Sequence, residues 1–341
     1  MLCVGVAQAY EHEVWQSGSL YYWKTFNVER GSSSDLATAI NGCLGSGNRE
    51  IHILCGGSLY STIRIPGNST KIYGHNNSFA KNHNELGVSN GYNGFELYDF
   101  TLTGGTSTSQ HGIRSTGASN LRFVNVKVLG SPWIGIRIDS KSSEAWTAWV
   151  SNLYMENITV ENCGSHGVET YSIDGVDMYG MVARNCGDCG VLNNRCEDIN
   201  IGTIDAYRCA VNNHYAGYRQ ANDCGVARIN RIVSNQCGRG IYIMGGSRDT
   251  EINSVDVRDC YYRGITTGDT GSNPVRVNSG TVTGTAGGYD IDIWDPTNVC
   301  IRVNGTTYGN ACGSSGITGT KKIINRASGK GMDAGGNSNG S

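Results

Sequence analysis

The chain has 341 residues, of which 38% are hydrophobic and 16% are charged, and its formal net charge is −2. This balance excludes the basic surface of a nucleic-acid-binding protein, and no apolar run is long enough to cross a bilayer. The 49 glycines and 4 prolines indicate many tight turns, without the composition of collagen or of a linker. We therefore expect a soluble protein with neither a nucleic acid nor a membrane as partner.

Residues 1–9 are apolar and end in Ala7-Gln8-Ala9, the small-x-small pattern of a signal-peptide cleavage site, although they lack a basic segment. The alternative is that residues 1–9 are a disordered N-terminal segment and not part of a signal peptide. Cleavage there would remove Cys3 and leave an even number of the 13 cysteines, which suits an oxidising compartment. Sequons for N-glycosylation start at Asn68, Asn76, Asn157 and Asn304. We predict a secreted, extracellular glycoprotein.

A short helix and the first strands are predicted next. Residues 10–33 are polar and aromatic and have no clean period. Asp35 then precedes apolar residues at helical spacing and glycines follow, so a helix is expected over about residues 35–44. It would cover the open end of a solenoid, whose first coil otherwise exposes unpaired backbone. Strands are expected at Glu50–Cys55, Ser58–Ile65 and Lys71–Gly74, and a disulfide between Cys43 and Cys55 would pin the helix to the first coil.

Glycines recur along most of the remaining chain, each followed by an apolar or aromatic residue. They are Gly112, Gly135, Gly167, Gly190, Gly217, Gly240, Gly264 and Gly288, separated by 23, 32, 23, 27, 23, 24 and 24 residues. A period of this length indicates stacked supersecondary units. The apolar run within each unit is too short to form a helix, so it is expected to be a strand. We interpret each unit as one coil of a parallel β-solenoid, with glycine at the sharp bend.

A column of cysteines has nearly the same period. It consists of Cys163, Cys186, Cys209, Cys237 and Cys260. Equivalent positions of neighbouring coils stack about 4.8 Å apart, so these residues are expected to fill one buried turn, with one or two disulfides along the column as the alternative. The spacing of Cys186 and Cys189 matches a metal-binding pair, but no second pair follows, so we assign it to packing or a disulfide.

The segments DLATAINGC and EIHILCGGSLYSTIRIPGNSTKIYGHNNSF, followed by the glycine-initiated coils, resemble the right-handed parallel β-helix proteins of the pectin-lyase-like superfamily. The resemblance covers roughly residues 34–310. It implies an all-β fold and a carbohydrate-active protein, since members include lyases, polygalacturonases and phage tailspikes. The polygalacturonase motifs and the calcium-ligand aspartates of the main pectate lyases are missing, so we expect a less familiar carbohydrate-active family.

The C-terminal part divides at residue 312. We expect the β-helix domain to span residues 10–312, with Cys300 and Cys312 closing the last ordered segment by a disulfide. Residues 313–341 are rich in glycine, serine, asparagine and lysine, which predicts a flexible tail.

Two coils carry extra residues, and insertions on solenoids often wall a binding face. The first insertion, at residues 141–149, contains Lys141, Trp146 and Trp149, and the second, at residues 210–215, contains His214. These insertions flank the coil that starts at Gly167, so we expect a substrate groove centred on that coil. The two tryptophans are expected either to cover the solenoid wall or to stack on sugar rings.

Strand alternation sorts the side chains of this region. If the residue after each glycine points inward, the second and fourth residues after it point outward. The outward candidates are Arg114, Arg137, Asp139, Glu169, Tyr171, Asn194, Arg219 and Tyr242. His166 lies at the bend before Gly167. Arg137, Asp139, Glu169, Tyr171 and Arg219 are therefore predicted to be neighbours on one wall.

Two chemistries compete on this wall. In β-elimination from a uronate-containing polysaccharide, a base removes a proton while a cation neutralises the sugar carboxyl group. The candidate bases are His166 and Tyr171, and the candidate neutralising groups are Arg137, Arg219 and Lys141. In glycoside hydrolysis or transfer, Asp139 and Glu169 would act as the two carboxyl groups. The excess of arginines over carboxylates favours a lyase.

A non-catalytic glycan-binding solenoid is the third interpretation. Arg114, taken alone, is explained by a solvated ion pair without any role in a site. No cofactor is expected, and no calcium-ligand set is recognised. The sugar, its linkage and the oligomeric state stay open at this point.

Overall fold

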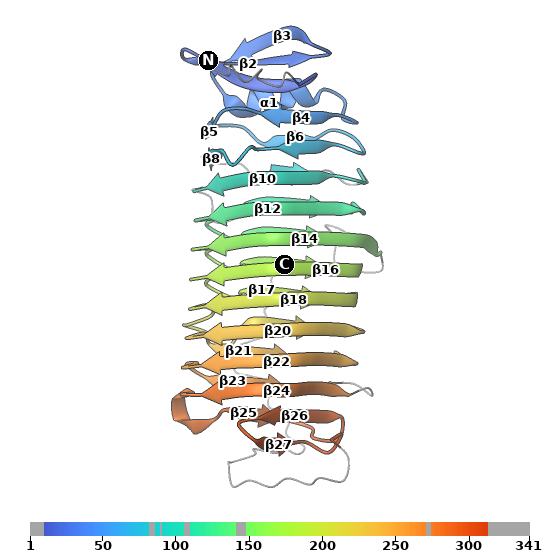
Figure 1. The fold of residues 1–341 in the computed structure, drawn as a ribbon, viewed down its shortest axis with the longest axis vertical. Helices are drawn as coiled ribbons and strands as arrows, with labels where there is room; N and C mark the ends of the chain where they lie inside the picture. The colour runs from blue at the N-terminus through green and yellow to red at the C-terminus, as the bar shows by residue number, and fades with distance from the viewer. Residues whose placement is uncertain are drawn as a thin grey trace, which may run out of the picture.

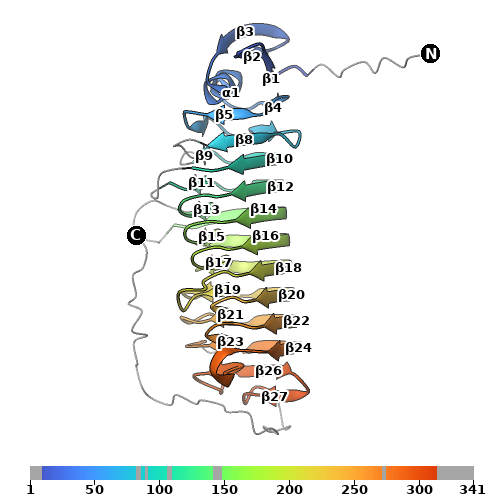
Figure 2. The same cartoon turned by 90° about the vertical axis from the view of Figure 1, so that its left-hand side faces the viewer.

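A computed structural model describes residues 10–81, 86–88, 91–105, 110–140, 148–270 and 274–312. The chain winds into a parallel β-solenoid whose coils are stacked along one axis below an N-terminal cap (Figure 1). A coil contributes one strand to each of two sheets, which lie on opposite sides of the core (Figure 2). The all-β solenoid predicted from the glycine period is therefore confirmed.

From β9 to β26 the strands of the two sheets alternate along the chain, whereas each of the first two coils gives two short strands to the larger sheet. The ten-stranded sheet contains β6 (Ile63–Ile65), β9 (Leu86–Val88), β11 (Ile113–Thr116), β13 (Ile136–Asp139), β15 (Val168–Tyr171), β17 (Val191–Asn194), β19 (Ala216–Ala221), β21 (Arg239–Ile243), β23 (Arg263–Thr267) and β25 (Ile291–Ile293). The parallel strands of the 17-stranded sheet are β4 (Glu50–Ile53), β5 (Gly57–Leu59), β7 (Lys71–Tyr73), β8 (Ser78–Lys81), β10 (Glu96–Thr103), β12 (Leu121–Leu129), β14 (Val150–Glu161), β16 (Ile173–Arg184), β18 (Glu197–Tyr207), β20 (Ala227–Asn235), β22 (Thr250–Arg258), β24 (Val275–Thr283) and β26 (Val299–Val303). A C-terminal strand, β27 (Thr306–Tyr308), pairs antiparallel with β26.

Close approach between coils explains the glycine column. A Cβ atom on Gly135 would lie 2.5 Å from the carbonyl oxygen of Gly167, and one on Gly167 would lie 2.6 Å from that of Gly190. Real Cβ atoms do not approach backbone oxygens so closely, so glycine is required where these coils touch. The prediction is wrong for Gly288, which lies in a 3₁₀ turn; Ile265 pairs with Ile291, so Asp290 holds the equivalent position.

The residue after each glycine points into the core, as alternation predicted. Ile113, Ile136, Val168 and Val191 pair in register on successive strands, and all are fully buried. The apolar side chains of both sheets interdigitate in one continuous core that runs the length of the solenoid. The second and fourth residues after each glycine consequently lie on the opposite, outer side of the ten-stranded sheet.

The cysteine column packs as thiols. All five of its members are buried and free, and each thiol donates a hydrogen bond to the carbonyl oxygen two residues before it, as Cys186 does to Arg184 at 3.6 Å. Burial raises the pKa of Cys260 to about 12, so that thiol stays protonated. The predicted Cys300–Cys312 disulfide is confirmed, whereas Cys43 and Cys55 are free, so the bridge predicted between them is wrong.

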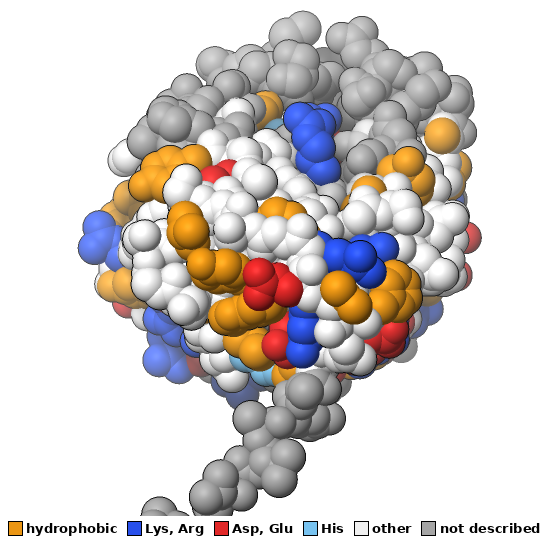
Figure 3. Space-filling view, turned by 90° about the horizontal axis from the view of Figure 1, so that it is seen from above, with side chains coloured by type: hydrophobic (Ala, Val, Ile, Leu, Met, Phe, Trp, Pro, Cys, Tyr) orange, Lys and Arg blue, Asp and Glu red, His pale blue; other side chains and the backbone are white. Residues whose placement is uncertain are grey.

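The solenoid is capped at its N-terminal end by a helix and an antiparallel sheet. Helix α1 spans Leu36–Leu44, and the Asp35 carboxylate accepts hydrogen bonds from the amides of Ala37 and Thr38. Strands β1 (Glu13–Ser17), β2 (Leu20–Thr25) and β3 (Val28–Ser33) lie beyond the helix (Figure 2). Seen end-on, the cap shows charged, polar and apolar side chains intermixed (Figure 3).

These three cap strands were not expected from residues 10–33. Strands β2 and β3 are partly exposed along most of their length, so their sequence does not alternate between apolar and polar residues. The helix itself follows the predicted bounds closely, because its cap residue and its apolar face are local signals.

A histidine pair joins the cap to the first coils and predicts a dependence of stability on pH. His52 is buried, its Nδ1 lies 2.9 Å from Nε2 of His75, its Nε2 lies 3.2 Å from Glu50 Oε1, and the Tyr10 ring stacks on it at 3.5 Å. Burial, together with the charge of His75, lowers the pKa of His52 against the opposing effect of Glu50. The unfolded chain therefore takes up this proton more readily than the folded one.

We expect the stabilising contribution of His52 to be complete above the ordinary histidine pKa and to be lost as the pH falls through the lowered value. Between pH 7.5 and pH 5, the melting temperature of the wild type should fall by roughly 2–4 °C more than that of His52→Gln. The exposed His214, replaced in the same way, is the matched control and should leave the difference unchanged. Equal pH dependence in wild type and His52→Gln would contradict this prediction.

Candidate functional site

A network of four charged side chains lies on the outer side of the ten-stranded sheet. Arg137 pairs in register with Arg114 on one side and with Glu169 on the other. Its Nε donates to Asp139 Oδ2 at 2.9 Å, and its Nη1 lies 3.6 Å from Glu169 Oε2. Arg114 Nη2 lies 3.9 Å from the same oxygen of Asp139. The structure thus brings these four predicted residues together.

This network is more enclosed than an open wall. The exposed fraction is 0% for Asp139, 7% for Glu169 and 8% for Arg137, whereas the Arg114 side chain keeps 32%. The two arginines balance the two carboxylates, as buried charges require. Among the described residues, Oδ1 of Asp139 and Nε of Arg114 have no hydrogen-bond partner. Buried polar atoms of this kind are costly unless they are used for binding or chemistry.

The environment of Asp139 favours its neutral form. Burial raises the pKa of the Asp139 carboxyl group, and the charges of Arg137 and Arg114 and the Thr116 hydroxyl oppose this effect without cancelling it. A carboxyl group with a raised pKa near a second carboxyl group is an arrangement in which the first can donate a proton while the second acts as base or nucleophile.

The two candidate bases are poorly placed for proton abstraction. The Cys189 amide donates to Nδ1 of His166 at 3.0 Å, so this nitrogen's lone pair is already engaged. Burial raises the pKa of Tyr171, and the charge of Arg195 only partly opposes this shift. A tyrosine acts as a base only in its ionised form, which the raised pKa disfavours. The His166 ring contacts Tyr215, with centroids 5.8 Å apart.

The other predicted residues fall in different surroundings. Asn194 is buried on the same outer side, where its side-chain oxygen accepts from Asn222 at 2.7 Å. Trp149 is 41% exposed, with the Arg195 guanidinium 5.2 Å from its ring, whereas His214 contacts the Tyr262 ring at 4.2 Å. Lys141 and Trp146 lie outside the described residues.

Arginines and tyrosines alternate along the same outer side, C-terminal to the network. We call this set the arginine–tyrosine ladder, and it consists of Arg219, Tyr242, Arg239, Tyr262, Arg263 and Tyr289. Only Arg219 and Tyr242 were predicted. Arg239 and Arg263 directly precede Gly240 and Gly264, so they occupy the bend position that His166 occupies three and four coils earlier. Applying the position of His166 to the later repeats of the sequence would have identified Arg239 and Arg263.

The described part of the chain holds no group of three or more histidine, cysteine, aspartate or glutamate side chains suited to a metal ion. Within the same residues, no helix is both long enough and apolar enough to span a membrane.

The fold has a counterpart among solved structures. The chain is similar to the full-length tailspike protein 2 from Escherichia coli O157:H7 bacteriophage CAB120, with a TM-score of 0.62 and 16% sequence identity. The alignment covers 89% of this chain and 50% of the tailspike chain, so the present chain spans half the length of that protein. No protein-family model and no curated protein sequence matches it. The likeness shows the fold; the pectin-lyase-like assignment stays a prediction.

Proposed function

We propose that the protein cleaves a polysaccharide by hydrolysis, using Asp139 and Glu169 on the outer side of the ten-stranded sheet. The observation that carries this proposal is the pair of carboxyl groups held by one guanidinium group, with the pKa raised at Asp139. The solenoid supports it, since stacked coils offer a long, regular surface to an extended polymer. The likeness to a phage tailspike is consistent with a protein that contacts glycans.

The proposed reaction divides the work between the two carboxyl groups. Asp139, in its neutral form, gives its proton to the glycosidic oxygen as the bond from that oxygen to the anomeric carbon breaks. Glu169, in its ionised form, either removes a proton from the attacking water or attacks the anomeric carbon itself, and the water supplies the new hydroxyl group. Arg137 holds both groups in place, since its Nε donates to Asp139 and its Nη1 lies 3.6 Å from Glu169.

Hydrolysis is favoured over the β-elimination expected from the sequence. Elimination needs a base with a free lone pair, but Nδ1 of His166 accepts from a backbone amide and the pKa of Tyr171 is raised. It also needs a cation for the sugar carboxyl group, whereas Arg137 is already engaged by the side chains of Asp139 and Glu169. Arg219 lies two coils from Glu169, since Leu192 stands between them in register.

Glycan binding without cleavage is the second candidate, and one observation favours it. Asp139 is fully buried and its Oδ2 accepts from Arg137, which is also the arrangement of an ion pair that only stabilises the sheet. A catalytic Asp139 requires that substrate binding open this part of the outer side.

The test is a digestion of a panel of neutral and acidic polysaccharides with the full chain. Hydrolysis predicts new reducing ends without the ultraviolet absorbance of an unsaturated uronate. Reducing ends accompanied by that absorbance would show elimination instead. Binding in the absence of any released product from every polymer would establish the non-catalytic alternative.

A further inference from the structure

The arginine–tyrosine ladder is built from repeated contacts between guanidinium groups and aromatic faces. The Arg219 guanidinium lies 5.3 Å from the ring centre of Tyr242, and that of Arg239 lies 4.2 Å from the same ring. Arg239 and Arg263 lie 4.6 and 4.1 Å from the ring of Tyr262. The contacts pass from coil to coil, so the ladder extends along the solenoid axis.

The ladder concentrates desolvated positive charge. Arg239 is 1% exposed and Arg263 is 7% exposed. Arg263 Nε lies 3.4 Å from Asp292 Oδ2, while Oδ1 of the buried Asp292 has no hydrogen-bond partner in the described part of the chain. A buried guanidinium group is costly unless anionic groups or hydrogen-bond acceptors satisfy its donors.

Arg219 is the member whose charge is least satisfied. Within the described residues, no carboxylate lies at ion-pair distance from it, and its Nε is buried without a hydrogen-bond partner. Its Nη2 reaches the sulfur of Met244 at 3.0 Å, which is a weak acceptor. Arg219 thus presents hydrogen-bond donors that a carboxylate or sulfate of a ligand would satisfy.

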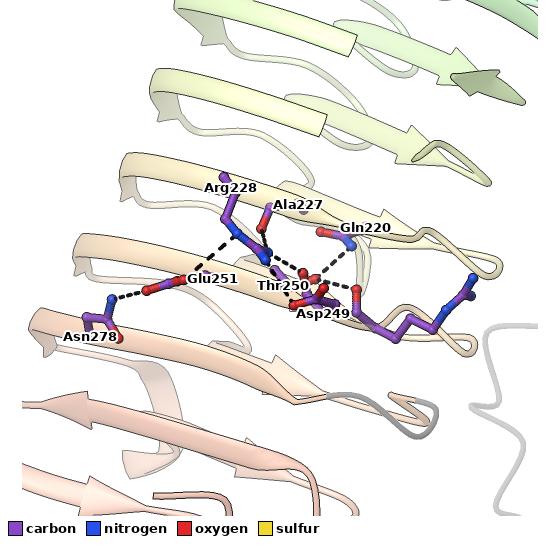
Figure 4. A network of polar contacts seen from close by, with 8 residues as sticks. Gln220, Ala227, Arg228, Asp249, Thr250, Glu251 and Asn278 are labelled. Carbon is purple, nitrogen blue, oxygen red and sulfur yellow. Dashed lines mark hydrogen bonds and ion pairs between the residues drawn. The ribbon is translucent and has the colours of Figure 1, made fainter. Parts of the chain in front are cut away.

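Arg228, on the 17-stranded sheet, differs from Arg219 in having carboxylate partners. Arg228, on β20, lies 3.2 Å from Asp249 and 3.9 Å from Glu251, and Glu251 in turn accepts from Asn278 (Figure 4). The network is half-exposed, so each charge is both paired and solvated. Arg137 and Arg263, on the same side as Arg219, also have carboxylate partners, in Asp139, Glu169 and Asp292. The lack of a counter-charge thus sets Arg219 apart from both groups of arginines.

We propose that the arginine–tyrosine ladder binds negatively charged sugar residues, so that the polymer recognised by this protein is an acidic polysaccharide. Arg219 pairs with an anionic group of the sugar, and the partly exposed rings of Tyr262 and Tyr289 offer apolar faces to sugar rings, over a buried layer that includes Arg239 and Arg263. Because coils repeat about every 4.8 Å, the ladder suits an extended polymer better than a single anion. The inference rests on the proposed function for its polymer, but binding here does not require cleavage.

The test measures the affinity of the full chain for polygalacturonate, alginate, hyaluronan, polysialic acid, dextran sulfate, and neutral dextran and galactomannan, by affinity electrophoresis and calorimetry. We expect tight binding to at least one acidic polymer, weakened by added salt, and about tenfold weaker binding in Arg219→Gln. Arg219→Lys, which keeps the charge but loses the planar fork, should fall between the two. Arg228→Gln is the matched control and should bind like the wild type.

Three outcomes would overturn the ladder as an acidic-sugar site. These are preferred binding to a neutral polymer, no binding to any acidic polymer, and equal loss of affinity in Arg219→Gln and Arg228→Gln. Circular dichroism of each variant establishes that it folds. Binding of an acidic polymer that is never cleaved would overturn the proposed hydrolysis and support the ladder as an acidic-sugar site. Cleavage confined to a neutral polymer would support hydrolysis and overturn the acidic-sugar site.

Discussion

Replacing Glu169 by glutamine is expected to lower the rate of polysaccharide cleavage by about a thousandfold while the protein keeps its fold. The amide has nearly the shape of the carboxylate, but it cannot take a proton from water or attack the anomeric carbon. It also removes the carboxylate that faces Nη1 of Arg137, so that the guanidinium keeps only its contact with Asp139. The release of reducing ends, measured alongside the melting temperature, checks this prediction.

The matched control for that experiment is Glu251→Gln. Glu251 also faces an arginine, Arg228, but it lies half-exposed on the 17-stranded sheet, away from the proposed site (Figure 4). We expect the Glu251→Gln variant to cleave the polysaccharide at the wild-type rate. His166→Ala separates the mechanisms, because hydrolysis through the carboxyl pair uses no base at His166 and elimination does. Cleavage at the wild-type rate by Glu169→Gln would rule out the proposed centre.

Replacing Gly167 by alanine is expected to destabilise the solenoid by about 3 kcal/mol or to prevent folding. The added methyl group would lie 2.6 Å from the Gly190 carbonyl oxygen and 2.6 Å from a methyl group of Val160. The oxygen belongs to the backbone of the next coil, which is fixed by pairing on both of its sides, so it cannot move away cheaply.

Gly87→Ala provides the control for this effect. Gly87 also lies in the ten-stranded sheet, but among the described residues a methyl group there would meet only a methyl group of Thr62, at 3.9 Å, which is an ordinary contact. Its free energy of unfolding should stay within about 0.5 kcal/mol of the wild type. Denaturant unfolding of both variants measures the difference, and equal stability would show that the glycine column does not mark close contact between coils.

The repeat made the core and the outer columns predictable. Once Gly135 and Gly167 were placed at equivalent bends, alternation set Ile136 and Val168 inward and Arg137 and Glu169 outward, and the strand register agrees. A one-residue error would have exchanged the two sides, so this placement depends on the glycine and not on the hydrophobicity of the strand alone.

Other features depend on contacts that the sequence does not encode locally. The burial of Asp139 and the order of alternating rings and guanidinium groups arise where bends and strands of different coils meet. Arg239 and Arg263 stand at bends, which strand alternation does not sort. The last coil was misplaced at Gly288 because an extra turn intervenes before Asp290, and no period reveals such a turn.

A crystal structure of Glu169→Gln with a bound oligosaccharide tests the central claim most directly. The account predicts sugar density along the outer side of the ten-stranded sheet, with a glycosidic oxygen within hydrogen-bond distance of Asp139. Sugar bound instead to the 17-stranded sheet or to the cap, with Asp139 still enclosed beside Arg137, would contradict it.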